Sequence, residues 1–307
     1  MISRHNAHRR SIWRNIKGLA VLVLLAPIAL SACSDPQIEI DDSAPSPALW
    51  RVENPHGELE GWLFGTIHSL PDGVEWRTAI LENSINESEW LVLEIGELDG
   101  SGELSRIFGE LSRTPDLPVL KDRVDQSLDT KVVRAMSKAG FNIGDFKNTE
   151  TWAAALTLAQ ANSFGKSQNG VDHALFNRFE NRLILEGARE QLSIFDGLPE
   201  EDQIDLLTAV IEDSDTDAKA EYRKLVEMWL FGDMDRLAAE NTKGILADPE
   251  LRAALLINRN EDWVRKIDAW MPEKGPMLIA VGAAHLAGED GLPALLRDEG
   301  YVVRRIQ

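Results

Sequence analysis

Leu63-Phe64-Gly65-Thr66-Ile67-His68-Ser69 is an apolar run that ends in Gly-x-x-His, and the same pattern returns near the other end of the chain in Met277-Leu278-Ile279-Ala280-Val281-Gly282-Ala283-Ala284-His285. Each stretch is typical of a buried strand that runs out into a loop. In open α/β sheets, ligands bind in the crevice at the carboxyl ends of the strands. His68 and His285 are therefore predicted to meet in one site, although each histidine taken alone also fits an ordinary satisfied polar side chain.

The segments around these two stretches predict an α/β protein. Short apolar or alternating runs between turn residues predict six strands, at Leu49–Glu53, Leu59–Thr66, Trp90–Glu94, Arg182–Glu186, Met277–Val281 and Tyr301–Ile306. Most of the intervening sequence has helical spacing. We therefore expect a mostly parallel central sheet with flanking helices and a large helical insertion, closed by a βαβ unit at the C-terminal end.

Charged and polar residues occupy positions where the crevice of such a sheet would lie. Glu94 and Glu186 each end a predicted strand, so each carboxylate is either exposed in the following loop or directed into the crevice. Arg259 and Asn260 lie on or beside the apolar stripe of a helix predicted over 249–270. An amide and a guanidinium need partners if they are buried, which leaves an internal salt bridge or a place in the crevice.

The composition limits the classes of partner. The chain has 307 residues, 44% of them hydrophobic, and a formal net charge of −19. The first 32 residues hold five of the 32 basic residues and no acidic one, so 27 basic residues stand against 51 acidic ones in the remainder, a net charge of −24. Such an acidic surface repels polyanions, which argues against a nucleic-acid partner.

The N-terminal residues predict export and lipidation. Arg9, Arg10 and Arg14 precede the apolar run from Leu19 to Leu30, which is too short to span a bilayer comfortably and lies where a signal peptide has its apolar region. The run ends in Leu30-Ser31-Ala32-Cys33 and resembles a bacterial lipoprotein signal, with cleavage before Cys33 and acylation of that cysteine. An ordinary membrane anchor or a signal peptide without lipidation are the alternatives. Cys33 is the single cysteine, so no intrachain disulfide is possible.

These features predict three parts of the chain. Residues 1–32 are the signal peptide, residues 33–47 are a flexible tether rich in Asp, Ser and Pro, and residues 48–307 are one folded domain. We expect the mature protein to be held in the cell envelope by lipid at Cys33 and to face the periplasm. Ser34, in place of an aspartate, favours the outer membrane over the inner one by resemblance to enterobacterial sorting.

Motifs for several other chemistries are missing or incomplete. The sequence has no His-Glu-x-x-His, the motif of zincins, and no Gly-x-Ser-x-Gly nucleophile elbow. Gly165-Lys166-Ser167 echoes a phosphate loop, but Gln160 stands where its first glycine is required. Asp213-x-Asp215-x-Asp217 begins like a calcium loop and ends in Lys224 instead of glutamate. Asp172 opens a predicted helix, and the pattern alone predicts that it is the N-terminal cap.

A set of short motifs, taken in order, resembles the TraB/GumN family, which is related to the Tiki metalloproteases. The motifs are Leu49-Trp50-Arg51-Val52, Gly65-Thr66-Ile67-His68, Gly170-Val171-Asp172, Glu190-Gln191-Leu192, Phe195-Asp196-x-Leu198-Pro199, Arg259-Asn260-x-x-Trp263, Val281-Gly282-Ala283-Ala284-His285-Leu286, Gly291-Leu292-Pro293 and Gly300-Tyr301-x-Val303. The resemblance covers about residues 48 to 307. It implies a core similar to that of the ChaN heme-binding and erythromycin-esterase-like proteins.

The resemblance also implies a site and a reaction. Tiki proteins are described as peptidases that depend on manganese or cobalt, so His68, His285 and Glu94 match metal-binding positions, with Glu94 as ligand or base. Arg259 matches a recurring arginine, and in catalysis it would steady a developing oxyanion or orient a carboxylate. Three further residues match recurrent positions of the family: Asp172, Glu186 and Asn260.

Together these observations predict a metal-dependent hydrolase of the cell envelope that acts on a peptide or protein. The first alternative is a lipoprotein that binds heme, a metal or a peptide without catalysis. The second alternative is that the motif residues only brace the fold. The sequence does not distinguish these three hypotheses.

Overall fold

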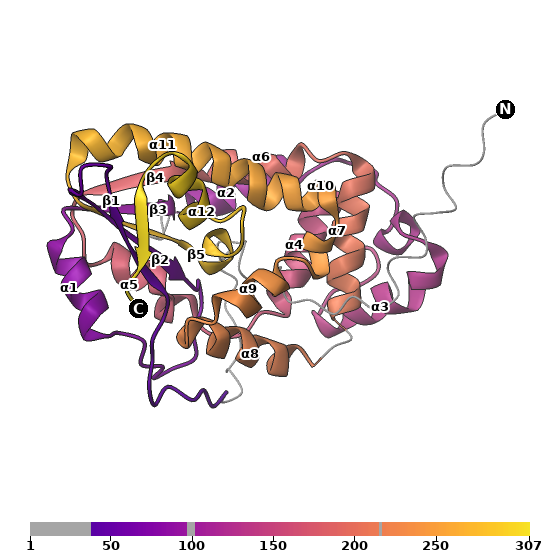
Figure 1. The fold of residues 1–307 in the computed structure, drawn as a ribbon. Coiled ribbons are helices and arrows are strands. Elements are labelled where there is room, and N and C mark those ends of the chain that lie inside the picture. The colour runs from indigo at the N-terminus through magenta and orange to yellow at the C-terminus, as the bar shows by residue number, and fades with distance from the viewer. Residues whose placement is uncertain (1–37, 97–101, 215–216) are drawn as a thin grey trace.

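A computed structural model describes residues 38–96, 102–214 and 217–307 (Figure 1). The predicted signal peptide and Cys33, the predicted site of acylation, lie outside the described residues. Within the described part of the chain, we find no helix that is both long enough and apolar enough to cross a membrane.

Six strands of the described residues form one mixed sheet. The strands are β1 (Leu49–Glu53), β2 (Leu59–Thr66), β3 (Trp90–Ile95), β4 (Arg182–Glu186), β5 (Met277–Gly282) and β6 (Val302–Arg305). They lie side by side in the order β4-β3-β5-β2-β1-β6. The pairs from β4 to β2 are parallel, and β1 is antiparallel to both of its neighbours. The α/β class with a mostly parallel sheet is confirmed, and every predicted strand agrees with the structure to within one residue at each end.

Helices fill the connections between the strands. The α-helices are α1 (Ala79–Glu87), α2 (Glu103–Leu111), α3 (Asp129–Lys138), α4 (Thr151–Ala161), α5 (Val171–Phe176), α6 (Ala188–Asp196), α7 (Glu200–Asp213), α8 (Ala218–Leu230), α9 (Met234–Glu240), α10 (Pro249–Arg252), α11 (Asn258–Lys274) and α12 (Leu292–Asp298). Short 3-10 turns are η5 (Leu120–Arg123), η6 (Gln126–Leu128), η7 (Ser167–Asn169), η8 (Gly244–Ala247) and η10 (Ala283–Leu286), and η9 (Ala253–Ile257) is a π-helix.

The long helix predicted over 249–270 is interrupted in the structure. It consists of α10, the π-helical turn η9 and α11. A π-turn inserts an extra residue and rotates the following helix about its axis. Here it lies directly before Arg259 and Asn260, so the rotation sets the direction in which these two side chains leave the helix.

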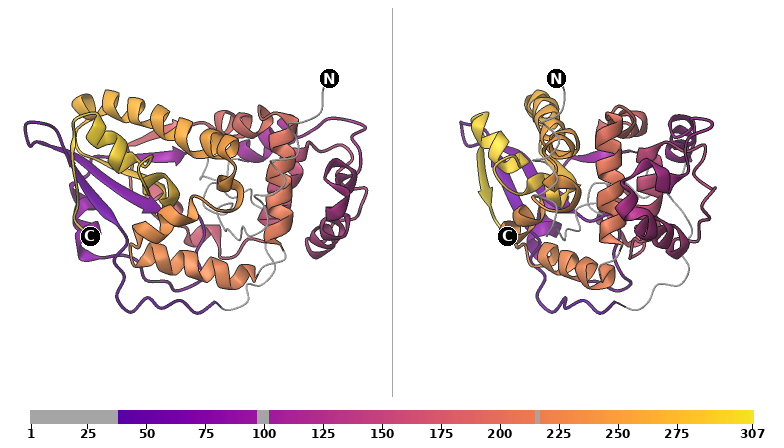
Figure 2. Two further views of the ribbon diagram at one scale, coloured as in Figure 1. Left: turned by 45° about the vertical axis from the view of Figure 1, so that its right-hand side comes forward. Right: turned by 90° about the vertical axis from the view of Figure 1, so that its right-hand side faces the viewer.

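The sheet is covered on both faces. On one face, α11 and α12 pack against alternate strand residues, including Trp263 and Ile267 against Leu63 and Ile279. On the other face, helices that include α1, α5 and α8 pack against the remaining strand residues, Phe64 among them. Figures 1 and 2 show that α3, α4 and α7 form a helical group beside the sheet rather than on it. This group is the large helical insertion that the sequence predicts.

Residues 38–47, the described part of the predicted tether, lie against the domain. Ile38 is buried in the core. The Asp42 carboxylate accepts a hydrogen bond of 2.8 Å from the Glu75 amide, and the Ser46 amide donates to the Leu230 carbonyl at 2.8 Å. These contacts hold the segment on the domain surface before β1 begins.

Two glycines allow the backbone to pack closely where the strands end. A methyl group on Gly65 would lie 3.1 Å from the β-carbon of Ala283, so the absence of a side chain lets the first Gly-x-x-His turn rest on the second. A methyl group on Gly170 would lie 2.2 Å from the His68 carbonyl oxygen. Beside it, the Val171 amide donates to the Ile67 carbonyl at 3.0 Å. Gly170 therefore fixes how near α5 comes to the exit of β2.

We expect Gly170→Ala to destabilise the protein by about 2–3 kcal/mol, because the added methyl group overlaps a main-chain oxygen that cannot rotate away. Gly109→Ala is the matched control: it lies inside α2, where a methyl group meets no atom within 4 Å. This control should raise the free energy of unfolding by up to about 1 kcal/mol through helix propensity. Urea denaturation measures both changes. Equal changes in the two variants would contradict the role assigned to Gly170.

Candidate functional site

The first half of the site joins the exit of β2 to the first turn of α5. The Thr66 hydroxyl donates to one oxygen of Asp172 at 2.6 Å, and Nδ1 of His68 lies 2.9 Å from the other oxygen. All three side chains are buried. Both oxygens of Asp172 are therefore occupied, and the imidazole is held with Nδ1 protonated toward the carboxylate.

The other ring nitrogen of His68 is buried and has no hydrogen-bond partner among the described residues. Buried polar atoms are nearly always paired, so an unpaired one requires an explanation. Burial by itself lowers the pKa of His68, but the charge and hydrogen bond of Asp172, together with the charge of Glu94, raise it to about 9. Asp172 thus fixes the orientation of the His68 ring, and the second ring nitrogen stays open in a site that favours positive charge.

The second half of the site is a buried network around Arg259. Its Nε lies 2.9 Å from Glu186 Oε1, its Nη2 lies 2.9 Å from Glu186 Oε2, and Nη2 also donates to Glu94. Its Nη1 donates to the Leu255 carbonyl at 3.1 Å and lies 3.3 Å from Nε2 of His285. A guanidinium has five N–H donors. These contacts use all five, which links the ends of β3 and β4 to the turn after β5.

Glu94 closes the network toward the second Gly-x-x-His motif. One of its oxygens accepts from the Gly282 amide at 3.3 Å, and the other accepts from the Gln191 amide group at 3.4 Å as well as from Arg259. The Glu94 side chain is buried. A strand-end carboxylate on β3 therefore binds the main chain of β5 at its exit.

His285 is held in its neutral form. Its Nδ1 lies 2.6 Å from the Asn260 side-chain oxygen and donates to it, which leaves Nε2 to accept from Arg259. The Asn260 amide group donates to the Asp290 carbonyl at 2.7 Å. Burial lowers the pKa of His285 well below its ordinary value, and the nearby charges of Arg259 and His68 lower it further. The two histidines thus differ: His68 favours the imidazolium and His285 the imidazole.

The charges of the buried cluster do not balance. Asp172, Glu94 and Glu186 have relative exposures of 5%, 2% and 4%, and Arg259 of 5%. With both histidines neutral and the carboxylates ionised, three negative charges face one positive charge. Burial raises the pKa of Glu186, although Arg259 opposes that shift. A buried excess of negative charge is costly unless a proton or another cation neutralises it.

A divalent cation fits this donor set in charge and only in part in geometry. His68 offers a free nitrogen whose partner nitrogen is held by a carboxylate, as is usual for metal-binding histidines. Nε2 of His285 and Oε1 of Glu94 are 4.0 Å apart, but both atoms bind Arg259. In this arrangement, no group of three or more His, Cys, Asp or Glu side chains in the described ranges is placed to hold one metal ion.

The structure brings the predicted site residues together at the carboxyl end of the sheet. Each of the seven is buried there: His68, Glu94, Asp172, Glu186, Arg259, Asn260 and His285. The sequence left open whether Glu94 and Glu186 are exposed and whether Arg259 forms a salt bridge. In the structure both carboxylates point inward, and Arg259 forms an internal salt bridge with each of them. The prediction that Asp172 caps a helix was wrong. Gly170 is the cap of α5, and the Asp172 side chain bonds across to β2 instead.

Three further residues belong to the site, and sequence reasoning did not assign them a role. Thr66 binds Asp172, Gln191 binds Glu94, and the indole nitrogen of Trp263 donates to Glu186 at 2.8 Å. The Trp263 ring also lies against His285, with centroids 4.3 Å apart. Trp263 had a signal in its place one turn after Arg259 on the same helix. Thr66 is the last residue of β2 and precedes His68 by two positions, and both Thr66 and Gln191 lie within motifs on which the family resemblance rests.

Comparison with known proteins gives a family and two relatives. The sequence profile of the TraB/PrgY/gumN family matches residues 48–305. The chain is similar to the uncharacterized protein YbaP of Shigella flexneri, with 24% identity over 253 residues, 78% of this chain and 89% of that protein. It is also similar to YbaP of Escherichia coli K12, with 24% identity over 247 residues, 76% of this chain and 87% of that protein. No solved structure matches the chain.

We expect the His68–Asp172 pair to make stability depend on pH. The pKa of His68 is raised in the folded state to about 9 from 6.5, so its contribution is complete below pH 6.5 and is lost as the pH rises through about 9. In buffer with a chelator, the stability advantage of wild type over His68→Gln should shrink by about 3 kcal/mol across this range. Urea denaturation at several pH values measures the difference. Parallel curves for the two proteins would contradict the assignment.

We expect Arg259→Gln to destabilise the protein by about 3–5 kcal/mol, because it leaves two buried carboxylates without their cation. Arg265→Gln is the matched control on the same helix, where the arginine pairs with Asp262 at the surface, and it should cost less than about 1 kcal/mol. An ion that binds Glu94 and His285 would compete with the guanidinium for them, and manganese should in that case raise the melting temperature of Arg259→Gln more than that of wild type. Calorimetric melting with and without manganese checks both statements, and an equal manganese response would refute the competition.

Proposed function

This chain belongs to the TraB/PrgY/gumN family, and we propose that it is a hydrolase that cleaves peptide-like acyl bonds where its two Gly-x-x-His turns meet. The observation that carries the proposal is the open nitrogen of His68. It is buried and has no hydrogen-bond partner among the described residues, while Asp172 holds the other nitrogen at 2.9 Å. A histidine oriented in this way is suited to proton transfer or to binding a cation.

The roles of the chain's residues follow from their contacts. His68 has one open position, Nε2, which either exchanges a proton with water or with the leaving group or binds a cation, and in both cases Asp172 fixes the ring and stabilises its positive charge. Arg259 has its five donors engaged, so we assign it to holding Glu94, Glu186 and His285 in place rather than to binding an oxyanion. Glu94 serves as the second acid–base group or ligand once a substrate or cation replaces its bond to Arg259.

A divalent cation, manganese or cobalt by family resemblance, would be held by His68, His285 and Glu94. The chemistry it supplies when bound is polarisation of a carbonyl group and a lower pKa for a bound water molecule. The negative excess of the buried cluster supports this assignment, because it equals two charges when both histidines are neutral. Lipid anchoring at Cys33 and a periplasmic location complete the proposal and rest on the N-terminal sequence.

A second candidate function is binding without turnover. The enclosure of the site favours it, since His285 has 0% and Glu94 has 2% relative exposure. A protein of this kind would take up heme, a metal or a peptide and release it unchanged. A heme Soret band, or tight peptide binding with no cleavage, would distinguish it from the hydrolase.

We expect the full-length chain with manganese or cobalt to cleave members of a quenched fluorescent peptide library. His68→Ala and His285→Ala should each lower turnover by about 10²–10⁴-fold, the usual contribution of a positioned acid–base group. His56→Ala is the control, because this histidine is exposed in the turn between β1 and β2, and it should leave turnover unchanged. If the double variant His68→Ala with His285→Ala cleaves as fast as wild type, the proposed site is wrong.

A further inference from the structure

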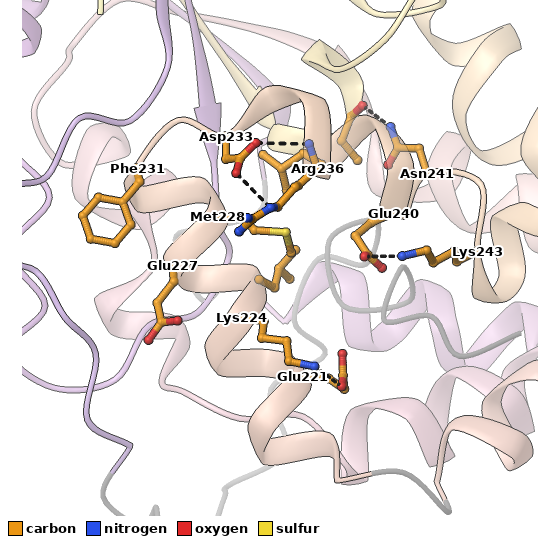
Figure 3. Close-up of a pocket in the computed structure, with 13 residues that line it drawn as sticks. Glu221, Lys224, Glu227, Met228, Phe231, Asp233, Arg236, Glu240, Asn241 and Lys243 are labelled. Carbon is orange, nitrogen blue, oxygen red and sulfur yellow. Dashed lines mark hydrogen bonds and ion pairs between the residues drawn. The ribbon is translucent and has the colours of Figure 1, made fainter.

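A groove opens between α8 and α9, beside the site described above (Figure 3). Its volume is about 600 Å³, which lies in the range of pockets that hold small ligands or short chain segments. Apolar side chains form its floor: Leu225, Met228, Leu237 and Ala284. Leu225 and Leu237 are buried, whereas Met228 is half-buried and lies between the two helices in Figure 3. A methionine adapts its shape to what it contacts, so this floor accepts apolar side chains of different form.

The walls of the groove carry more acidic than basic side chains. Four acidic and three basic residues line it. Each basic residue forms an ion pair with the acidic residue three positions before it: Lys224 with Glu221 at 2.7 Å, Arg236 with Asp233 at 3.2 Å and Lys243 with Glu240 at 2.7 Å. Glu227 is the fourth acid and has no cation partner among the described residues. Surface pairs of this kind contribute little stability and open readily. The groove therefore has an excess of one acidic side chain, Glu227, which suits a ligand with positive charge.

The groove shares its inner wall with the turn that carries His285. Ala284 lines the groove and directly precedes His285, and the buried Asn241 side chain donates to the Ala284 carbonyl at 2.8 Å. From α8, the Trp229 indole donates to the Gly65 carbonyl at 2.8 Å. The helices that form the groove thus also hold the main chain of both Gly-x-x-His turns. A ligand in the groove lies against this main chain.

We propose that the groove is a subsite for an extended polypeptide segment that places an apolar side chain over Met228 and a lysine or arginine next to it at the acidic wall. The proposal rests on the proposed hydrolase function and adds the class of substrate. An apolar side chain matches the floor, and a basic one matches the excess of acidic residues. The strongly acidic chain as a whole attracts the same kind of partner and repels acidic ones.

The test uses the full-length chain in nanodiscs of zwitterionic lipid, with empty nanodiscs as the blank. Two fluorescein-labelled pentapeptides serve as probes, one of alternating leucine and lysine and one in which glutamate replaces lysine. Fluorescence anisotropy should show at least tenfold tighter binding of the lysine peptide. Hydrogen exchange followed by mass spectrometry should show that this peptide protects the segment containing residues 283–287 and leaves the turn at 54–57 unchanged.

The variant Met228→Lys places a positive charge on the floor and should remove the preference for the lysine peptide. Ile80→Lys makes the same kind of change on α1, where Ile80 is 45% exposed and outside the groove, and should keep the preference. Circular dichroism confirms that both variants are folded. Equal binding of the two peptides, or no effect of Met228→Lys, would overturn the proposal, as would protection confined to a different part of the chain.

Binding and turnover are separable in this design. His68→Ala should bind the lysine peptide as tightly as wild type while its turnover is lost. Turnover by wild type without groove binding would refute the subsite and leave the hydrolase intact. Groove binding without turnover by wild type would refute the hydrolase and keep the groove as a binding site for the same class of peptide.

Discussion

One guanidinium holds the carboxyl end of the sheet together. Arg259 enters from α11 and binds Glu186 at the end of β4, Glu94 at the end of β3 and His285 in the turn after β5. Replacing such a buried network by apolar side chains often leaves the stability of a protein unchanged, whereas removing one partner alone lowers it strongly. Its value to this fold is therefore orientation. Around Arg259, two carboxylates and an imidazole are directed into one enclosed space.

Close approach of main chains completes this orientation, and the paired motifs explain it. The first motif needs a glycine because Ala283 of the second motif packs on Gly65. A second glycine is needed at Gly170, the N-cap of α5, because this residue lies directly against the His68 carbonyl just after β2. Side chains from α8 and α9 then bind main-chain carbonyls of both turns. Each histidine is thus positioned by its main chain first and by its hydrogen bonds second.

The strands could be predicted from sequence because their signals are local. Short apolar runs between turn residues defined all six, and their carboxyl ends placed Glu94, Glu186 and both histidines at one edge. The π-turn at Ala253–Ile257 has no such signal, because its residues are alanine, leucine and isoleucine, which an uninterrupted α-helix accepts equally well. Asp172 was misread for a related reason. Its helix start is a local pattern, but its partners Thr66 and His68 lie more than one hundred residues away. Gln191 lies in a motif of the family resemblance, but its contact with Glu94 could not be predicted, because an amide on a helix face does not indicate its partner.

The charge balance of the cluster determines what kind of species the site can accept. Asp172, Glu94 and Glu186 are enclosed with one arginine, so the site is short of positive charge whenever both histidines are neutral. The negative charges of Asp172 and Glu94 raise the pKa of His68, so a proton bound there supplies one of the missing positive charges. His285 cannot respond in the same way, because burial and then the charge of Arg259 keep its pKa low and Arg259 lies on its free nitrogen. An added proton is therefore accepted at the open nitrogen of His68 and not at His285. The same asymmetry makes an anionic ligand unfavourable at this nitrogen unless His68 is already protonated.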